Sequence, residues 1–421
     1  MKLGFILEGP GRSFADWRHP DADPASAYSF PFFLDQTRTA ERGKFDFVFL
    51  ADLVHTNRNA TPYHQSRLEP VTCLAALAAV TSHIGLVLTV SSTFTAPYNL
   101  ARYFASLDRI SGGRSAWNLV TTYADSSGPN FGQSGLPAHD LRYEMADEHL
   151  DAVQALWDSR DDAAGIHAAD YAGEFYQVRG PLDIRRSPQG QPVIFQAGAS
   201  EKGRDFAARR AECLFANPFT LADGQSYHRD MMARVAKAGR DPAQVHTIVA
   251  MTPFIGRTRE EAEAKYEQRA ALLDMKLALT HLSKFFDYKE DLTQYDVNAK
   301  LPGHLIEKYF DGYQSALSQV ADLAARGMTL GQIARYIATP KSLFLGTPTD
   351  MADIMQQWFE EEAADGFMVA DGVPGQLTQF VDEVVPILQR RGLFRTEYEG
   401  RTLRENLAID PPPNRFLRAS A

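Results

Sequence analysis

The sequence predicts an α/β protein: a closed (β/α)8 barrel, the TIM-barrel architecture, with a long insertion between its seventh and eighth strands. Short apolar runs alternate with helical patterns almost from one end of the chain to the other, and eight of these runs are typical of strands. Strands separated by helices pair in parallel, and eight such units favour a closed barrel. A doubly wound open sheet, the competing architecture, requires a Gly-x-Gly-x-x-Gly turn after the first strand, which Gly9-Pro10-Gly11 does not provide.

The predicted strands are short apolar runs bounded by turn residues, a pattern typical of buried strands. They cover residues 3–7, 45–50, 84–90, 115–120, 192–196, 213–216, 246–254 and 366–370. The predicted helices cover residues 31–42, 69–82, 98–110, 141–157, 203–210, 226–238 and 377–390. The third of these helices ends at Gly112-Gly113, because glycine accepts the left-handed conformation at a helix C-terminus. The fourth is amphipathic, and Asp140 is expected to cap its N-terminus.

Residues 256–346, between the last two strands, are too many for a simple connection. We expect a long charged helix at 259–279, an aromatic, loop-like segment at 285–303 and a further helix at 305–326. We interpret the segment as an insertion that covers the barrel mouth as a lid; a peripheral oligomerisation element is the alternative. The whole chain, 1–421, is then a single barrel domain with this insertion and a C-terminal extension at 393–421.

Composition excludes several classes of protein. The chain has 421 residues and a net charge of −10, which argues against nucleic-acid binding, since phosphate backbones attract basic surfaces. A phosphate site must then be local, built from backbone N–H groups and a few basic side chains. We find no His-x-x-x-His or Cys-x-x-Cys spacing and therefore expect no metal site. We see neither a signal peptide nor a stretch apolar enough to span a membrane, so we expect a cytoplasmic protein.

The barrel fold itself selects candidate site residues, because active sites of such barrels lie at the C-terminal ends of the strands. This rule selects Asp52, Thr89, residues 91–93, residues 118–122 and residues 196–200. From these we take Asp52, Thr89, Ser91, Asn118, Gly198, Ala199 and Ser200 as candidates. Small residues at 198–200 allow close backbone approach, and Ser200 at a helix N-cap leaves N–H groups that suit a phosphate. His139 and Tyr143, four residues apart, share one face of a first helical turn.

Several motifs in fixed order resemble flavin-dependent monooxygenases of the bacterial-luciferase-like superfamily. The similar subgroup contains nitrilotriacetate, dibenzothiophene sulfone and long-chain alkane monooxygenases. The motifs span residues 39–52 (TAERGKFDFVFLAD), 68–85, 107–143, 178–203 (VRGPLDIRRSPQGQPVIFQAGASEKG) and 393–407 (LFRTEYEGRTLRENL). The resemblance covers most of the chain, and the fixed order of the motifs makes it specific.

The resemblance implies the oxygenase component of a two-component system. Reduced FMN would come from a separate NAD(P)H-dependent flavin reductase and react with O₂ to a C4a-peroxyflavin, which oxidises a small organic substrate. In the family, residues matching Asp52, Thr89, His139 and Tyr143 contact the flavin, and the segment matching Ser200 binds its phosphate end. We add Ser91, Asn118, Gly198 and Ala199 to the cofactor-binding set and assign His139 a catalytic role. A homodimer or homotetramer is expected.

Two alternatives stay open: an oxidoreductase of the same superfamily that uses the deazaflavin F420, and a non-catalytic flavin-binding protein. The substrate also stays open, because the chain departs from the subgroup in its loops. Residues 53–67 and 158–178 look shorter, and residues 9–17 hold no histidine. His55, His64 and His281 are candidate acids or bases on the substrate side.

Overall fold

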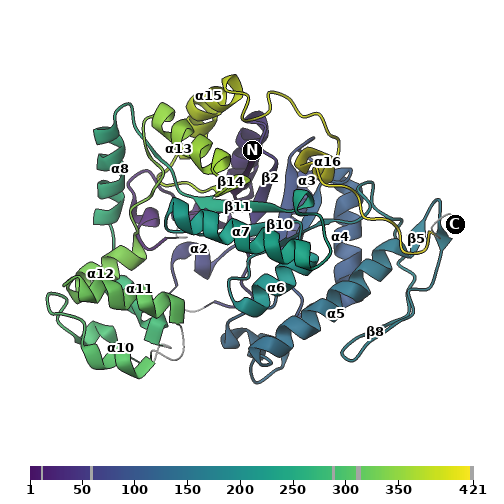
Figure 1. Ribbon diagram of the computed structural model, residues 1–421, viewed down its shortest axis with the longest axis horizontal. Helices are drawn as coiled ribbons and strands as arrows, with labels where there is room; N and C mark the ends of the chain where they lie inside the picture. Colours follow the sequence, from purple (N-terminus) through teal and green to yellow (C-terminus); the bar gives the residue numbers. More distant parts are fainter. Residues whose placement is uncertain (11–12, 57–59, 287–289, 310–313, 418–421) are drawn as a thin grey trace.

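The computed structural model describes residues 1–10, 13–56, 60–286, 290–309 and 314–417, and its centre is a closed parallel barrel (Figure 1). The barrel strands are β1 (Lys2–Ile6), β2 (Phe47–Leu50), β3 (Gly85–Ser91), β4 (Ser115–Val120), β9 (Val193–Gln196), β10 (Cys213–Ala216), β11 (His246–Met251) and β14 (Gly366–Val369). The barrel closes because β1 pairs with both β2 and β14. The predicted (β/α)8 barrel is therefore confirmed, with each predicted strand in its place.

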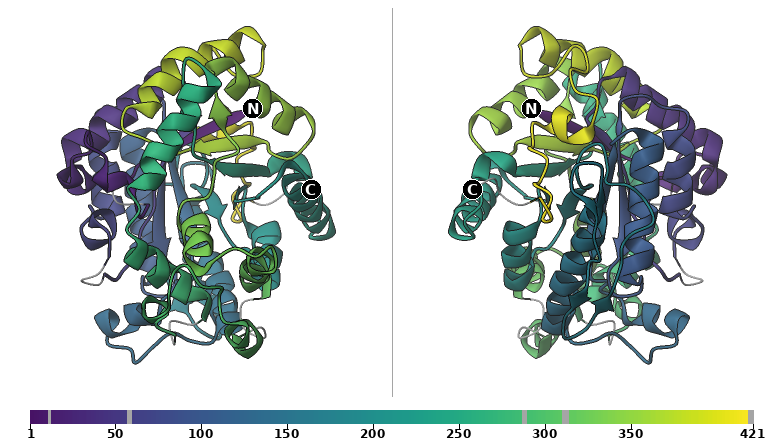
Figure 2. Two further views of the ribbon diagram at one scale, coloured as in Figure 1. Left: turned by 90° about the vertical axis from the view of Figure 1, so that its left-hand side faces the viewer. Right: turned by 90° about the vertical axis from the view of Figure 1, so that its right-hand side faces the viewer.

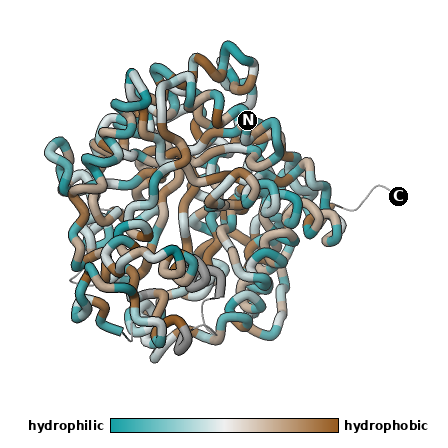
Figure 3. The backbone as a smooth tube through the Cα atoms, turned by 60° about the vertical axis from the view of Figure 1, so that its left-hand side comes forward, coloured by the Kyte–Doolittle hydropathy of each residue, from teal (hydrophilic) through white to brown (hydrophobic). Residues whose placement is uncertain are grey.

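Helices surround the barrel and cover the outer faces of its strands (Figure 2). They are α1 (Phe30–Arg42), α3 (Pro70–Ala78), α4 (Pro97–Ser111), α5 (His139–Asp158), α6 (Glu201–Arg210), α7 (Leu221–Lys237), α13 (Pro348–Glu360), α14 (Gln376–Gln379) and α15 (Val385–Arg390). Smaller elements are α2 (Pro62–Gln65) and two hairpins, β5 (Arg160–Asp161) with β6 (Gly165–Ile166) and β7 (Tyr171–Ala172) with β8 (Gln177–Val178). Apolar segments gather in the centre of the molecule (Figure 3). No helix among the described residues is long and apolar enough to cross a membrane.

Aromatic side chains fill the inside of the barrel, so it is a packed core and not a pore. The ring centroids of Phe47 and Phe195 lie 5.0 Å apart, and those of Phe49 and Phe215 lie 4.8 Å apart. The Phe47 ring packs directly on the backbone of Gly4, where any Cβ would collide with it. Because these rings fill the middle of the barrel, a polar site can form only at one of its ends.

The C-terminal extension closes the N-terminal end of the barrel. Its helix α16 (Leu403–Leu407) contributes Leu403 and Leu407 to the apolar cluster inside the barrel. The backbone oxygen of Leu407 lies 2.7 Å from Nε2 of His246, the first residue of β11. Arg395 pairs with the fully buried Asp46, which precedes β2. Only the opposite end, where the strands finish, is left for a site.

The insertion has a small apolar core of its own. It lies between the paired strands β12 (Phe254–Ile255) and β13 (Leu345–Gly346) and contains α8 (Arg259–Ala271), α9 (Met275–Leu282), α10 (Gly303–Tyr309), α11 (Gln314–Ala325) and α12 (Leu330–Ala338). The prediction of one helix over residues 259–279 is wrong, because the chain breaks after α8. Asp274 then caps α9 by accepting the N–H of Leu277 at 3.1 Å.

The insertion packs against the loop that follows β1. The rings of Phe14 and His281 lie 4.5 Å apart, and Arg18 forms a 3.0 Å ion pair with Asp274. This loop leaves the C-terminal end of β1, so the insertion lies on the mouth side, whereas α16 lies at the other end (Figure 1). The position is the one that a lid requires.

Leu407→Ala tests the role of the C-terminal extension. Leu407 is fully buried in the barrel cluster, so its replacement should lower the free energy of unfolding by about 2–5 kcal/mol, measured by urea denaturation. Leu417→Ala is the control, because Leu417 belongs to the same extension but is 48% exposed, and the change should be within about 0.5 kcal/mol. Equal effects of the two substitutions would contradict a barrel sealed by α16.

Candidate functional site

A buried polar pair lies at the centre of the barrel mouth. Thr89 of β3 and Asn118 of β4 are register partners, and Nδ2 of Asn118 donates a 2.9 Å hydrogen bond to Oγ1 of Thr89. Both residues are only 4% exposed, and Oδ1 of Asn118 has no hydrogen-bond partner among the described residues. A buried acceptor without a partner costs about 1–3 kcal/mol. The pair therefore offers an acceptor to an N–H group that the chain itself does not supply.

Ser91 continues the same wall of the site towards solvent. Residues 89 and 91 point to the same face of β3, because side chains alternate along a strand. The Ser91 hydroxyl lies 2.6 Å from the hydroxyl of Thr122, just after β4. Thr122 has a φ of +52°, a conformation that non-glycine residues adopt at an energetic cost and that is frequent at functional sites.

Asp52 lies just beyond the end of β2, on the same end of the barrel. Its carboxylate is 20% exposed, accepts the N–H of Leu53 at 2.8 Å and lies 3.6 Å from Nε of Arg67. Burial raises the pKa of Asp52, and Arg67 opposes that rise without cancelling it. Asp52 thus presents a partly desolvated carboxylate that can accept a hydrogen bond from a bound ligand.

The turn between β9 and α6 forms a cradle for an anion. Ser200 is the N-cap of α6, as predicted, and its hydroxyl accepts the N–H of Gly203 at 3.1 Å. A Cβ at position 198 would lie 2.8 Å from the Cα of Gly203, so glycine there lets the turn fold onto the helix. The following residue, Ala199, is small and exposed. The first N–H groups of a helix bind anions, because they point outward and carry the positive end of the helix dipole.

His139 and Tyr143 complete this cradle from the first turn of α5. Nε2 of His139 lies 3.4 Å from the Ser200 hydroxyl, and the His139 and Tyr143 rings contact each other at 5.3 Å. The Tyr143 hydroxyl lies over Gly203, 2.7 Å from where a Cβ would be. Hydroxyl and imidazole groups from two helices therefore surround one helix N-terminus.

The prediction that Asp140 caps α5 is wrong. The helix begins at His139, its N-cap is Ala138, and no side chain caps it. Asp140 instead lies 2.8 Å from Nδ1 of His139, and this hydrogen bond lowers the pKa of Asp140. Because Asp140 holds Nδ1, Nε2 is the nitrogen of His139 that is turned towards Ser200.

Two basic side chains beside the cradle are already paired. Lys202 forms a 3.1 Å ion pair with Glu144, and Arg204 forms a 3.0 Å ion pair with Asp230. Anion binding by this turn therefore depends on N–H and O–H donors more than on net positive charge, which fits the negative charge of the whole chain.

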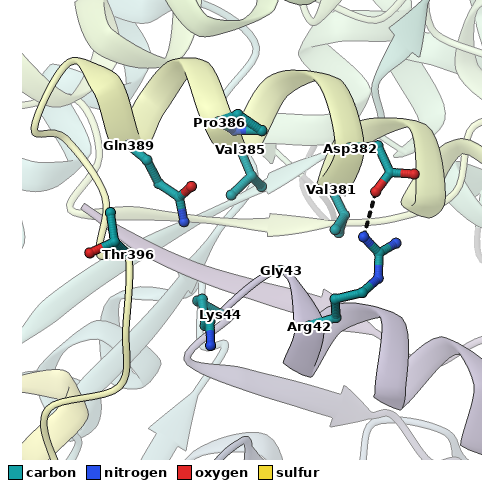
Figure 4. A pocket seen from close by; sticks show the side chains of 9 residues that line it. All are labelled: Arg42, Gly43, Lys44, Val381, Asp382, Val385, Pro386, Gln389 and Thr396. Atoms are coloured by element: carbon teal, nitrogen blue, oxygen red, sulfur yellow. Dashed lines mark hydrogen bonds and ion pairs between the residues drawn. The ribbon is translucent and has the colours of Figure 1, made fainter.

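One hollow of about 300 Å³ lies away from this site (Figure 4). It is lined by Arg42, Gly43 and Lys44 before β2 and by residues of α15 and the segment before it, at the N-terminal end of the barrel. Arg42 pairs with Asp382 at 2.5 Å and Lys44 with Glu397 at 2.7 Å, so its cations are occupied. No group of three or more His, Cys, Asp or Glu side chains with the arrangement of metal ligands occurs in the described part of the chain.

The predicted site residues thus lie on the side of the barrel where the strands end, and His139 and Tyr143 are in the first turn of α5. They form a central group (Asp52, Thr89, Ser91, Asn118) and an anion cradle (His139, Tyr143, Gly198, Ala199, Ser200). Sequence patterns did not single out Arg67, and they placed Thr122 at a strand end without indicating its backbone conformation. Arg67 comes near Asp52 only through the path of the loop between them, and the backbone conformation of Thr122 has no sequence signal. Of the candidate histidines, His55 lies beside Arg67, whose guanidinium donates to its backbone oxygen at 3.3 Å, and His281 lies in the insertion.

Comparison with known proteins identifies the family of the chain. Residues 12–365 match the family described as luciferase-like monooxygenase. The chain is 41% identical to nitrilotriacetate monooxygenase component A of Aminobacter aminovorans, covering 100% of this chain and 99% of that protein. It is 39% identical to N-acetyl-S-(2-succino)cysteine monooxygenase of Bacillus subtilis (strain 168), and the similarity covers 99% of this chain and 98% of that protein.

A solved structure is similar along the same length. The crystal structure of a riboflavin lyase with modified FMN and riboflavin superposes with a TM-score of 0.83 at 30% identity, covering 97% of this chain and 95% of that one. Dibenzothiophene-sulfone and long-chain alkane monooxygenases are also among the relatives, so the resemblance to this subgroup is confirmed.

Replacing Asn118 tests whether its oxygen is free for a ligand. Asn118→Leu removes one hydrogen bond, to Thr89, together with a buried acceptor that has no partner in the described chain. The two effects oppose each other, so the free energy of unfolding of the ligand-free protein should fall by less than about 1 kcal/mol or should rise. Asn414→Leu is the control, because this equally buried amide bonds to Asp158 and Phe416 and its loss should cost about 1–3 kcal/mol. Similar losses in both variants would show that Asn118 serves stability alone.

Proposed function

Since the chain belongs to the luciferase-like monooxygenase family, we propose that it is an FMNH₂-dependent monooxygenase and the oxygenase component of a two-component system. The observation that carries the proposal is the pairing of a buried acceptor, Oδ1 of Asn118, with an anion cradle at Ser200 on the same end of the barrel. Relatives that are named monooxygenases favour oxygenation over F420-dependent reduction and over passive flavin binding.

The residues present fit FMN. Oδ1 of Asn118 and the carboxylate of Asp52 would accept the ring N–H groups, with Thr89 and Ser91 beside them. The phosphate would lie at the N-terminus of α6, held by Ser200 and Tyr143, while Gly198 and Ala199 leave room for it. The riboflavin lyase structure with modified FMN supports this choice of flavin.

When bound, reduced FMN supplies the activation of O₂. The chain itself must orient the flavin and exclude water from the reacting oxygen. We assign His139 a catalytic role, since Nδ1 donates to Asp140, which fixes the ring, and Nε2 faces the cradle, where the doubly protonated ring would donate a hydrogen bond to the cofactor. The insertion, at residues 256–346, would close over the mouth as a lid, because it already contacts the loop after β1.

A separate reductase follows from the same proposal. The sequence holds no dinucleotide-binding turn after its first strand, so the flavin would be reduced on another protein. One relative is named as a component of nitrilotriacetate monooxygenase and another as one of the subunits of pristinamycin IIA synthase. Both names support a partner component, which we propose to be an NAD(P)H-dependent flavin reductase.

We further propose that the protein forms a homodimer or homotetramer. Tyr103 and Ile110, exposed apolar residues of α4, are consistent with self-association.

The substrates named for two relatives narrow the substrate class. Nitrilotriacetate and N-acetyl-S-(2-succino)cysteine both carry several carboxylates. We propose that this chain also oxidises a small organic molecule that carries carboxylate groups.

The purified chain mixed with FMN and NADH should oxidise NADH no faster than the same mixture without protein. Addition of an unrelated flavin reductase should start oxygen consumption, because free FMNH₂ diffuses between proteins. With a true substrate present, less H₂O₂ should be released per O₂ consumed, as an oxygen electrode and a peroxide assay would show. Rapid NADH oxidation by the isolated chain, or a peroxide yield that no carboxylate substrate lowers, would count against the proposal.

Discrimination between FMN and riboflavin tests the cradle. Charge-assisted hydrogen bonds are roughly twice as strong as neutral ones, so FMN should bind at least about tenfold more tightly than riboflavin in a fluorescence titration. Ser200→Ala should reduce that ratio. Thr220→Ala removes the matching cap from α7 at a similar cost of about 1 kcal/mol in stability, yet it should leave the ratio unchanged. Equal affinity for the two flavins in the unmodified chain would place the phosphate elsewhere.

A further inference from the structure

The side chain of Arg67 is largely buried, but most of its guanidinium N–H groups make no hydrogen bond to the described part of the chain. Its side chain is 10% exposed and lies in the loop that follows β2, between α2 and α3. Its terminal nitrogen donates to the backbone oxygen of His55 at 3.3 Å, and its guanidinium carbon lies 5.7 Å from the Tyr63 ring. A guanidinium carries five N–H donors, and within the described residues this is the one hydrogen bond that Arg67 makes.

Other buried arginines of the chain show what a structural role looks like. Arg114 donates five hydrogen bonds, to Ser111, Ala78, Ile84 and both polar atoms of Thr81. Arg404 donates to three backbone oxygens and pairs with Glu212 at 3.0 Å. Arg67, which makes one hydrogen bond in the part of the chain that the structure describes, is not engaged in this way.

Asp52 forms a long ion pair with Arg67 but takes none of its N–H donors. The closest distance between them, 3.6 Å from Nε to Oδ1, is too long for a hydrogen bond. Burial raises the pKa of Asp52, and the charge of Arg67 opposes that rise. Arg67 therefore keeps N–H donors that a ligand at the mouth can use.

His55 adds a second donor next to Arg67. Its Nδ1 lies 3.2 Å from the hydroxyl of the buried Ser127, which leaves Nε2 for another partner. Burial lowers the pKa of His55, and the charge of Arg67 lowers it further, which favours the neutral ring. In the tautomer whose Nδ1 accepts from Ser127, the proton is on Nε2, which can then donate to a ligand.

We propose that Arg67 determines substrate specificity by binding a carboxylate of the substrate at the barrel mouth, beside Asp52, with His55 as a second donor. The inference rests on the proposed function and names the residue that would recognise the substrate class. A guanidinium matches a carboxylate with two parallel N–H···O bonds. Since the chain carries a net charge of −10, an anionic substrate needs such a local cation to enter.

Calorimetric titration of the FMN-loaded full chain tests the proposal. The probes are nitrilotriacetate and succinate, each compared with its neutral amide. The unmodified chain should bind at least one carboxylate about tenfold or more tightly than its amide, which corresponds to about 1.4 kcal/mol. Arg67→Met should abolish this preference, and Arg67→Lys should retain part of it. Arg42→Met removes the same charge at the opposite end of the barrel and should leave the preference intact.

Three results would overturn the proposal: no carboxylate preference in the unmodified chain, an equal loss in Arg42→Met, or an unchanged preference in Arg67→Met. A fall in FMN affinity in Arg67→Met with an unchanged carboxylate preference would assign Arg67 to the cofactor. Thermal unfolding of each variant shows whether it is folded. If Arg67→Met does not fold, the carboxylate preference of Arg67→Lys, which should be reduced but not lost, is compared with that of the unmodified chain instead. Carboxylate binding that depends on Arg67 in a chain without oxygenase activity would refute the proposed function and leave this subsite standing.

Discussion

The whole site depends on the closed parallel hydrogen-bond ladder of the barrel. Closure fixes the register between neighbouring strands, and that register places Thr89 opposite Asn118 and Asn118 opposite Phe195. One step of strand register would turn Asn118 away from the barrel interior. Below this level the Phe47, Phe195 and Phe215 rings fill the barrel, and α16 seals its other end. Polar side chains of the interior are thus confined to the mouth.

We interpret the open polar groups at the barrel mouth as marks of a binding site. Asn414 and Arg404 are buried and bonded on all sides, as expected for residues selected for stability. Asn118 is equally enclosed but leaves an acceptor without a partner among the described residues, and the largely buried Arg67 leaves several donors open at the mouth. A chain tolerates such a cost where a ligand removes it, so local violations of good hydrogen bonding tend to mark sites.

Local patterns predicted the fold well and the site in part. Apolar runs between helical patterns located all eight strands, and the glycine pair after α4 and the Ser200 cap were read correctly because each depends only on neighbouring residues. The single helix expected at 259–279 failed because the break at Asp274 is stabilised by tertiary contacts with Arg18. The prediction that Asp140 caps α5 failed because the Asp140 carboxylate is hydrogen-bonded to Nδ1 of His139 instead. The sealing role of α16 and the position of Arg67 depend on contacts between distant segments, which no local pattern encodes.

The central claim is that one flavin extends from Asn118 to the N-terminus of α6. A crystal structure of the full chain with FMN tests it most directly. The account predicts a ring N–H group within hydrogen-bond distance of Oδ1 of Asn118 and the phosphate on Ser200, Tyr143 and Nε2 of His139. An FMN molecule bound elsewhere, or one whose phosphate lies away from the α6 N-terminus while Oδ1 of Asn118 keeps no partner, would contradict the account.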